Sequence, residues 1–332
     1  MKTKEELKKY YEEQLLNELK GLDGKRKKTL LYLVGYTILA GFAALLLAAI
    51  MLVSIYLLQG TCALCGGIGV PILLVVLFGF WVYGLSRIKR GYTKDFKTNV
   101  VLKVVKFIDE GLEYAPGKSI SSSDYHKSKI FLSHVDIYSG EDYVFGTVGK
   151  TKVEFSEVHT QEKHETTDSK GHRHTYYTTI FKGVFFIADF NKNFKGATLV
   201  LPDTAEKTFG KMLGGFLQSK NIGRPTLVKL EDPEFEKLFV VYGEDQIEAR
   251  YILSTSLMQR ITEFRKKSNR SIYLSFVENK VMIAVPSGKD LFEPRLFRSI
   301  VDYGQIEDYY NDLAFVVGIV EDLNLNTRIW GK

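Results

Sequence analysis

Four of the six histidines lie close together in the sequence, where they could bind a metal or exchange protons near neutral pH. They are His159, His164, His172 and His174. His172 and His174 would share one face of a strand, whereas His159 and His164 would fall on opposite faces. In the expected hairpin, His164 would lie near Arg173 and His174. The pattern favours a solvated hairpin tip over a metal site, and His164, His172 and His174 are the candidate ligands.

Cys62 and Cys65 are the only cysteines, and they have the C-x-x-C spacing of a redox pair or half of a zinc site. A zinc site needs about four ligands, and a thioredoxin-like motif needs a βαβ context, neither of which is present around these residues. The pair is therefore a candidate disulfide, Cys62 with Cys65, that would close a turn in an oxidising compartment.

Two other patterns resemble functional motifs. Gly146–Thr151 is similar to the end of a phosphate-binding loop, but Val144 stands where that motif needs a glycine, so we interpret the segment as a hairpin turn. Acidic residues are numerous between Glu231 and Glu248, where helix caps and an Asp-Pro turn explain them. The sequence shows no recognisable catalytic motif, and we expect no cofactor.

The element that dominates the chain is an uncharged block of 58 residues, Thr29–Ser86. It is far longer than the apolar core of a signal peptide. Leu30–Leu58 would extend beyond the roughly 30 Å hydrocarbon core as a helix, and Ile68–Leu85 is long enough for a second span. Gln59–Gly67 interrupts them with glycines and polar groups. The block predicts two transmembrane helices joined by a short turn.

Basic clusters flank this block on both sides, at Lys25–Lys28 and Arg87–Arg90. The positive-inside rule therefore places residues 1–28 and 87–332 together in the cytoplasm. We expect a multi-pass protein of the cell inner (plasma) membrane with both termini cytoplasmic. Because the net charge of +6 is concentrated at these flanks, it indicates a membrane pattern and not a nucleic-acid surface.

Apolar residues recur at helical spacing on either side of the block, from Leu7 to Leu22 and from Tyr92 to Ile108. Both segments leave the same end of the expected hairpin, so we expect them to pack as an antiparallel stalk. The alternative is that one of them lies flat on acidic lipid, which its lysines would favour.

The remainder predicts a cytosolic α+β domain with a mainly antiparallel sheet. Phe181–Phe190 is apolar on both faces and should form a central, covered strand. The expected strands are Ile130–Tyr138, Tyr143–Val148, Lys152–Val158, Thr175–Phe190, Ala197–Leu201, Ile272–Phe276 and Lys280–Val285; the expected helices are Thr204–Gln218, Leu253–Lys267 and Ile306–Leu323. The expected divisions are 1–28, a cytosolic amphipathic helix; 29–86, the transmembrane hairpin; 87–115, a juxtamembrane helix; 116–325, the α+β domain; and 326–332, a tail.

Several segments resemble one bacterial family as a set. They are Phe181–Phe194, Leu201–Asp203, Glu231–Glu236, Tyr242 with Gln246–Tyr251, and Leu291–Pro294. Together they are similar to the domain-of-unknown-function family numbered 3137, whose members commonly join a membrane hairpin to a cytosolic domain. The resemblance implies no catalytic residues. It implies a LemA-type membrane protein as a partner, through neighbouring genes.

Two functions are consistent with this sequence. The first is a membrane-anchored, cytoplasmic-facing binding or scaffolding protein, with the lipid bilayer and a membrane protein as partners, no nucleic acid, and a homo-oligomer as a further option. The alternative is a membrane-tethered enzyme with its site in the α+β domain, for which Asp189, Asp203 and Arg250 are polar candidates within the family-like segments.

Overall fold

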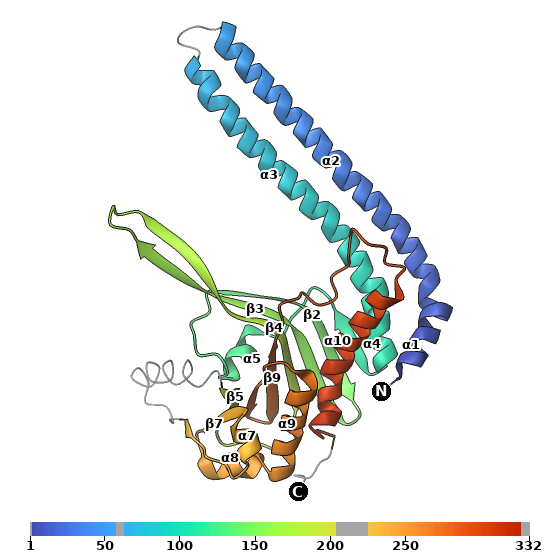
Figure 1. The fold of residues 1–332 in the computed structure, drawn as a ribbon, viewed down its shortest axis with the longest axis vertical. Helices are drawn as coiled ribbons and strands as arrows, with labels where there is room; N and C mark the ends of the chain where they lie inside the picture. Colours follow the sequence, from blue (N-terminus) through green and yellow to red (C-terminus); the bar gives the residue numbers. More distant parts are fainter. Residues whose placement is uncertain (1, 58–62, 204–224, 327–332) are drawn as a thin grey trace. The chain divides into compact units, whose positions relative to one another are not determined.

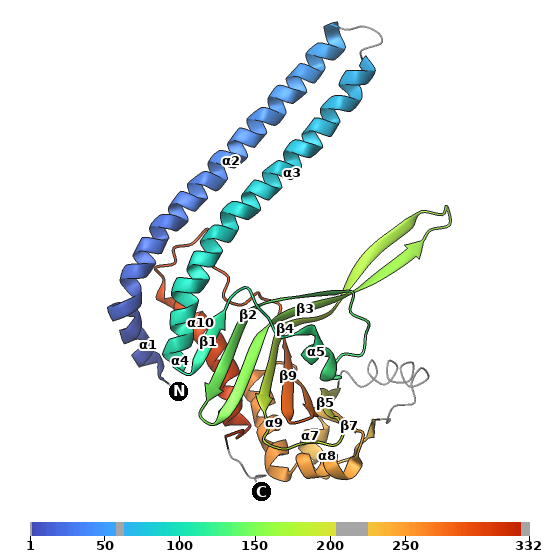
Figure 2. The same ribbon diagram turned by 180° about the vertical axis from the view of Figure 1, so that it is seen from behind.

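The computed structural model describes residues 2–57, 63–203 and 225–326, and these divide into two compact units. The hairpin unit comprises residues 3–101 and 293–307, and the sheet unit comprises residues 102–292 with the chain from 308 onward and Lys2. The expected helix Thr204–Gln218 and the Cys62 end of the predicted disulfide lie outside the described residues. Figures 1 and 2 show the two units from opposite sides.

The hairpin unit consists of two long antiparallel helices with short helical segments at one end (Figure 1). Its elements are α1 (Lys4–Tyr10), the π-helical turn η1 (Tyr11–Leu15), α2 (Leu16–Leu57), α3 (Ala63–Phe96) and the π-helical turn η2 (Lys97–Val101). Thr3 begins α1 as a capping box, because its hydroxyl accepts the Glu6 N–H and the Glu6 carboxylate accepts the Thr3 N–H. Within the described residues, two helices are long and apolar enough to cross a membrane.

The end of the hairpin near α1 forms the expected antiparallel stalk. Leu15 and Leu19 on one side and Phe96 and Val100 on the other are fully buried. The Lys25 ammonium lies 2.7 Å from the Asp95 carboxylate across the pair. Further along, Tyr36 donates a hydrogen bond to the Phe80 carbonyl at 3.0 Å. The apolar stripes predicted from the sequence are therefore buried at this end of the hairpin, and the Lys25–Asp95 ion pair joins the two helices.

In the described residues, the sheet unit is built on nine antiparallel strands in the order β1-β2-β3-β4-β9-β8-β5-β7-β6. The strands are β1 (Leu112–Ala115), β2 (Ile137–Val148), β3 (Thr151–Thr167), β4 (Arg173–Asp189), β5 (Thr198–Pro202), β6 (Thr226–Leu227), β7 (Phe239–Gly243), β8 (Tyr273–Val277) and β9 (Lys280–Pro286). The helices are α4 (Leu102–Ile108), α5 (Ser122–Lys127), α7 (Pro233–Glu236), α8 (Gln246–Ile252), α9 (Thr255–Ser268) and α10 (Tyr303–Asp322), whose first turn belongs to the hairpin unit. The predicted α+β class with an antiparallel sheet is confirmed.

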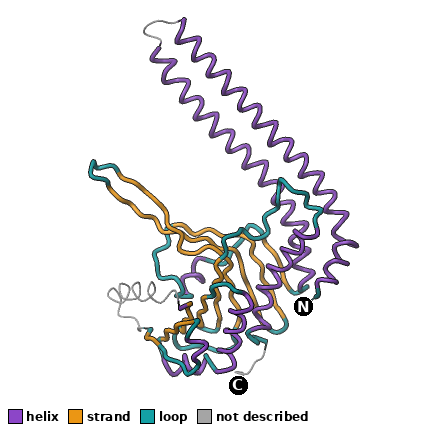
Figure 3. The backbone as a smooth tube through the Cα atoms, in the orientation of Figure 1, coloured by secondary structure: helices purple, strands orange, loops and turns teal. Residues whose placement is uncertain are grey.

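The strand β4 is central, as its apolar sequence predicted. Phe185 and Phe186 point to opposite faces, and both are fully buried. Phe185 belongs to a core cluster with Tyr125 of α5, Met282 and Ala284, on the face opposite α9 and α10. Beyond residue 161, β3 pairs with β4 alone, so the two strands project from the sheet as a ribbon (Figure 3).

Three sequence expectations need correction. The strand expected at Ile130–Tyr138 begins only at Ile137, because Phe131 turns onto the sheet face and packs against the Tyr125 ring (5.6 Å between centroids) and the Phe181 ring (5.0 Å). The juxtamembrane helix ends at Ile108, and residues 112–115 pair with β2 as β1. In the ribbon, His164 lies opposite Tyr176 and not near Arg173, because the turn spans only residues 168–172.

Candidate binding site

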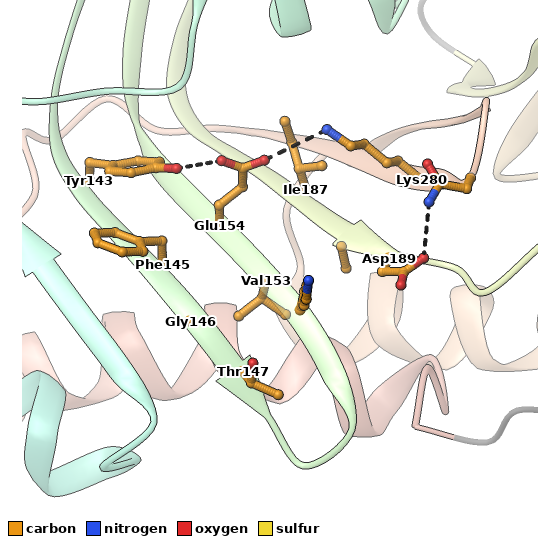
Figure 4. Close-up of a pocket in the computed structure, with 12 residues that line it drawn as sticks. Tyr143, Phe145, Gly146, Thr147, Val153, Glu154, Ile187, Asp189 and Lys280 are labelled. Carbon is orange, nitrogen blue, oxygen red and sulfur yellow. Dashed lines mark hydrogen bonds and ion pairs between the residues drawn. The ribbon is translucent and has the colours of Figure 1, made fainter.

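An open hollow of about 540 Å³ lies on the sheet face that α5 only partly covers. Figure 4 shows its side chains in front of the strands, with helices behind the sheet. The lining comes from β2, β3, β4, β9 and the turn before β9. It consists of Tyr143, Phe145, Gly146, Thr147, Lys152, Val153, Glu154, Ile187, Ala188, Asp189, Asn279 and Lys280. Because side chains alternate along a strand, this face continues the core cluster to which Ile187 also belongs.

The polar centre of the hollow is the Glu154 carboxylate, which three strands surround. The Tyr143 hydroxyl of β2 donates a hydrogen bond to Glu154 Oε2 at 2.5 Å (Figure 4). The Lys280 ammonium of β9 lies 3.9 Å from Glu154 Oε1 and 3.7 Å from the Asp124 carboxylate of α5. The strand register produces this arrangement. Glu154 of β3 is paired with Ile187 of β4, and Lys280 of β9 is paired with Asp189, two residues further along β4, so both side chains lie on the same face of the sheet.

The Tyr143 phenol is held in its protonated form. Burial raises its pKa well above the usual value of 10.0, and the hydrogen bond to Glu154 and the negative charge of Glu154 raise it further. Tyr143 therefore remains a hydrogen-bond donor throughout the physiological pH range.

The two ends of the hollow differ in character. At one end, the Tyr143 and Phe145 rings stack at 5.1 Å and form an aromatic surface. At the other end, Asp189 Oδ1 accepts the Asn191 N–H at 3.0 Å and the Asn279 side-chain N–H at 3.5 Å. The aromatic surface, with the Glu154 carboxylate hydrogen-bonded to Tyr143, can recognise a cationic group attached to an apolar one.

The three histidines that the sequence singled out as candidate ligands do not form one cluster. The His164 ring stacks on Tyr176 at 5.0 Å, whereas the His172 and His174 rings lie 3.0 Å and 3.7 Å from the Asp168 carboxylate. In the part of the chain that the structure describes, no group of three or more His, Cys, Asp or Glu residues is placed to hold a metal ion. The structure thus separates the candidate ligand His164 from the other two.

The acidic residues between Glu231 and Glu248 have structural partners. Asp232 accepts the N–H groups that begin α7, and Asp245 accepts those that begin α8. The Glu248 carboxylate accepts the Lys195 and Gly196 N–H groups at 3.0–3.1 Å, so it holds the loop before β5. The interpretation as caps and turns is correct for Asp232 and Asp245.

The segment Gly146–Thr151 forms the end of β2, a turn and the start of β3, as expected for a hairpin turn. Gly146 has φ +152°, and a Cβ there would lie 2.1 Å from the Gly111 carbonyl oxygen. This glycine therefore allows β1 to approach β2 closely. The close approach explains the glycine, so no phosphate-binding role is needed.

The three candidates for a catalytic role are dispersed. Asp189 lines the hollow, whereas Asp203 and Arg250 are exposed at other positions of the sheet unit. Sequence reasoning missed Tyr143, Glu154 and Lys280. Glu154 stands between the apolar residues Val153 and Phe155, and this break in a buried strand was the available signal.

Of the comparisons with known proteins, the match to a family model agrees with the resemblance in the sequence. No curated protein matches the chain. The crystal structure of the mycobacterial trehalose monomycolate transport factor A, TtfA, is similar with 11% sequence identity and a TM-score of 0.31, over 68% of this chain and 96% of that chain. Residues 179–325 match the family model described as "Protein of unknown function (DUF3137)", and this range includes the β4 and β9 sides of the hollow. Residues 179–325 of this chain are thus similar to the DUF3137 family.

Proposed function

We propose that this protein is a membrane-anchored binding protein, in which α2 and α3 cross the bilayer and the sheet unit recognises a partner protein through the hollow around Glu154. The anchor is supported by apolar side chains exposed along both helices, such as Leu31 at 70% and Val75 at 71% exposure. Soluble proteins rarely expose such continuous apolar surface. The basic flanks support a multi-pass arrangement in the cell inner (plasma) membrane, with both termini and the sheet unit in the cytoplasm.

The shape and chemistry of the hollow carry the proposed binding role. Sites for small molecules usually bury most of the ligand, whereas this hollow is open along the sheet face. Its polar groups hold one another through the Tyr143–Glu154–Lys280 contacts and so present a fixed surface. This arrangement suits a protruding segment of a partner protein with a basic side chain directed to Glu154 and the aromatic rings.

A crosslinking experiment in the native host tests this proposal. The photoreactive residue p-benzoylphenylalanine replaces Thr147 in the hollow of the full chain or, as a control, the exposed Tyr177 of the ribbon. We expect an adduct with a specific protein from Thr147 alone. Its yield should fall about ten-fold in Glu154→Gln, because a hydrogen bond to a charged group contributes about 1.5–3 kcal/mol. Equal adducts from both positions, or no effect of Glu154→Gln, would contradict the binding role.

The identity of the adduct also tests the proposed partners. A LemA-type membrane protein is the partner that the family resemblance suggests, and an adduct between two copies of this chain would identify a homo-oligomer. The enzyme alternative rests on Asp189, the one candidate of the three that lines the hollow. A small molecule that is converted by the wild-type protein, but not by Asp189→Asn, would favour that alternative.

A further inference from the structure

Within the hairpin unit, residues 293–302, which we call the strap, are held against α2 and the η2 turn that follows α3. The Glu293 carboxylate lies 3.0 Å from the ammonium of Lys97, a residue with only 2% exposure. The Arg26 guanidinium of α2 donates a hydrogen bond to the Leu296 carbonyl at 2.8 Å. Both views of the ribbon show the strap beside the ends of α2 and α3 (Figures 1 and 2).

Asp23 fixes the other half of the strap to α2. Its Oδ1 atom accepts the Ser299 hydroxyl at 3.1 Å, the Ile300 N–H at 3.4 Å and the Arg26 Nε–H at 2.8 Å. Ile300 itself is fully buried. The strap is therefore attached through backbone and side chain, and its middle residues have a defined position relative to α2.

The middle of the strap exposes an aromatic ring between two cations. Phe297 has 84% exposure, and among the described residues no other large apolar side chain is more exposed. Its neighbours Arg295 and Arg298 are also exposed. Burial of Leu296 and Ile300 on the hairpin side leaves Phe297 on the outer side.

The strap lies at the level where α2 would enter a bilayer. Arg26, which holds Leu296, precedes the exposed apolar residue Leu31 by five residues, which is about 7.5 Å along a helix. The headgroup region on each side of a bilayer is about 5–8 Å thick. The lysines and arginines that flank the apolar spans are exposed: Lys27, Lys28, Arg87, Lys89 and Arg90.

We propose that the strap is a second membrane contact, in which Phe297 inserts at the headgroup–acyl boundary of an anionic bilayer and Arg295 and Arg298 bind lipid phosphates. Aromatic rings favour this boundary, and each cation close to an anionic surface adds to the attraction. This inference rests on the proposed crossing of the membrane by α2 and α3. It adds a lipid-binding site formed by residues about 270 positions away from α2 in the sequence.

The test uses the full chain with Cys62→Ser and Cys65→Ser, reconstituted in nanodiscs of phosphatidylcholine with or without phosphatidylglycerol. A single environment-sensitive dye is attached to Phe297→Cys, Leu31→Cys or Glu12→Cys, and quenching by spin-labelled lipid is measured. Glu12 is exposed and lies about 28 Å from Leu31 along the helical segments, on the side away from the apolar span, so it is the aqueous control.

We expect the dye at position 297 to be quenched at least two-fold more than the dye at position 12, and more strongly with phosphatidylglycerol. Arg295→Gln with Arg298→Gln should remove the dependence on phosphatidylglycerol. If position 31 is quenched while position 297 behaves like position 12, the strap contact is wrong and the anchor stands. If position 31 is not quenched, the anchor fails, and the strap contact fails with it.

A second measurement leaves Phe297 in place. Trypsin cleavage after Arg295 and Arg298 of the wild-type chain should be slower in anionic nanodiscs than in neutral ones, whereas cleavage after the exposed Lys170 of the ribbon turn should be equal in both. Equal rates at Arg295 and Arg298 in the two lipids would overturn the proposal.

Discussion

Glu157 of β3 is a buried acid in the sheet unit, with 6% exposure, and its carboxylate accepts the Leu291 N–H at 2.7 Å. Burial raises its pKa from 4.5 to about 7, and the hydrogen bond from Leu291 offsets part of this increase. Neighbouring acids add to the increase: Asp290, Asp142 and Glu141. A carboxyl group with this pKa changes its charge in the range where cytoplasmic pH varies.

The raised pKa makes the stability of the sheet unit depend on pH. Because the folded state binds the Glu157 proton more tightly than the unfolded state, stability is greatest below about pH 4.5 and is lost as pH rises to about 7. The loss from this group is on the order of 1–3 kcal/mol. We expect Glu157→Gln to remove this dependence.

Circular dichroism melting of the full chain in detergent between pH 5 and pH 8 checks the Glu157 prediction. The melting temperature of the wild type should fall by several degrees more than that of Glu157→Gln. Parallel curves for the two proteins would show that another group controls the pH response.

At the scale of single residues, the sequence predicted contacts between near neighbours in the chain better than contacts between different strands. Asp232 and Asp245 could be interpreted as helix caps because a cap contacts residues only two or three positions away. The contact between Tyr143 and Glu154 depends on strand register, and the contact of Glu154 with Lys280 joins strands far apart in the sequence. No spacing in the sequence encodes that pairing.

Among the elements, the strap is held mainly by Asp23. Burial raises the pKa of Asp23, but hydrogen bonds from Arg26 and Ser299 and the charge of Arg26 outweigh this effect and leave the pKa at about 2. Asp23→Asn removes the charge that compensates the buried Arg26, and breaking such a pair typically costs about 3–5 kcal/mol. We expect the strap to detach more often from α2.

Limited trypsin digestion in detergent measures this detachment. Cleavage after Arg295 and Arg298 should be at least about ten-fold faster in Asp23→Asn than in the wild type, given a local cost above about 1.4 kcal/mol. Glu12→Gln, which changes an exposed acid of η1, should leave the rate unchanged. An unchanged rate in Asp23→Asn would mean that other contacts hold the strap.

The central strand β4 contains a second sensitive position, Gly183. Its φ is +155°, and a Cβ would lie 2.2 Å from the Val285 carbonyl oxygen of β9. We therefore expect Gly183→Ala to destabilise the sheet unit by about 3 kcal/mol, through overpacking against backbone and an unfavourable φ. Gly117→Ala is the matched control, because a Cβ at Gly117 would have no atom within 4 Å among the described residues. Similar melting temperatures for both variants would contradict this prediction.

The elements also show what periodicity can and cannot predict. Phe181–Phe190 was identified as a central strand because both of its faces are apolar, and β4 has this position. Ile130–Tyr138 has a similar composition, but Phe131 covers the sheet face instead of joining it. An aromatic residue that packs onto a sheet has the same apolar character as one that belongs to a strand. Tertiary contacts, and not the sequence pattern, therefore determine which of the two structures forms.

At the scale of the whole molecule, the proposed topology makes a prediction about accessibility. In this topology, the basic flanks would place the linked end of the hairpin, with Cys62 and Cys65, outside and the sheet unit inside. In spheroplasts of a bacterial host, a membrane-impermeant maleimide should label these cysteines in the full chain after reduction. Less labelling without reduction would support the predicted disulfide between them.

A cysteine introduced into the sheet unit tests the same topology from the other side of the membrane. Lys170 lies in the exposed turn of the ribbon, so Lys170→Cys on a Cys62→Ser, Cys65→Ser background reports the side on which the sheet unit lies. We expect this cysteine to react only after the spheroplasts are lysed. Labelling of Lys170→Cys in intact spheroplasts, without labelling of Cys62 and Cys65, would show the opposite orientation. The partner of the hollow around Glu154 would then have to be sought outside the cytoplasm, because recognition requires both proteins on the same side of the membrane.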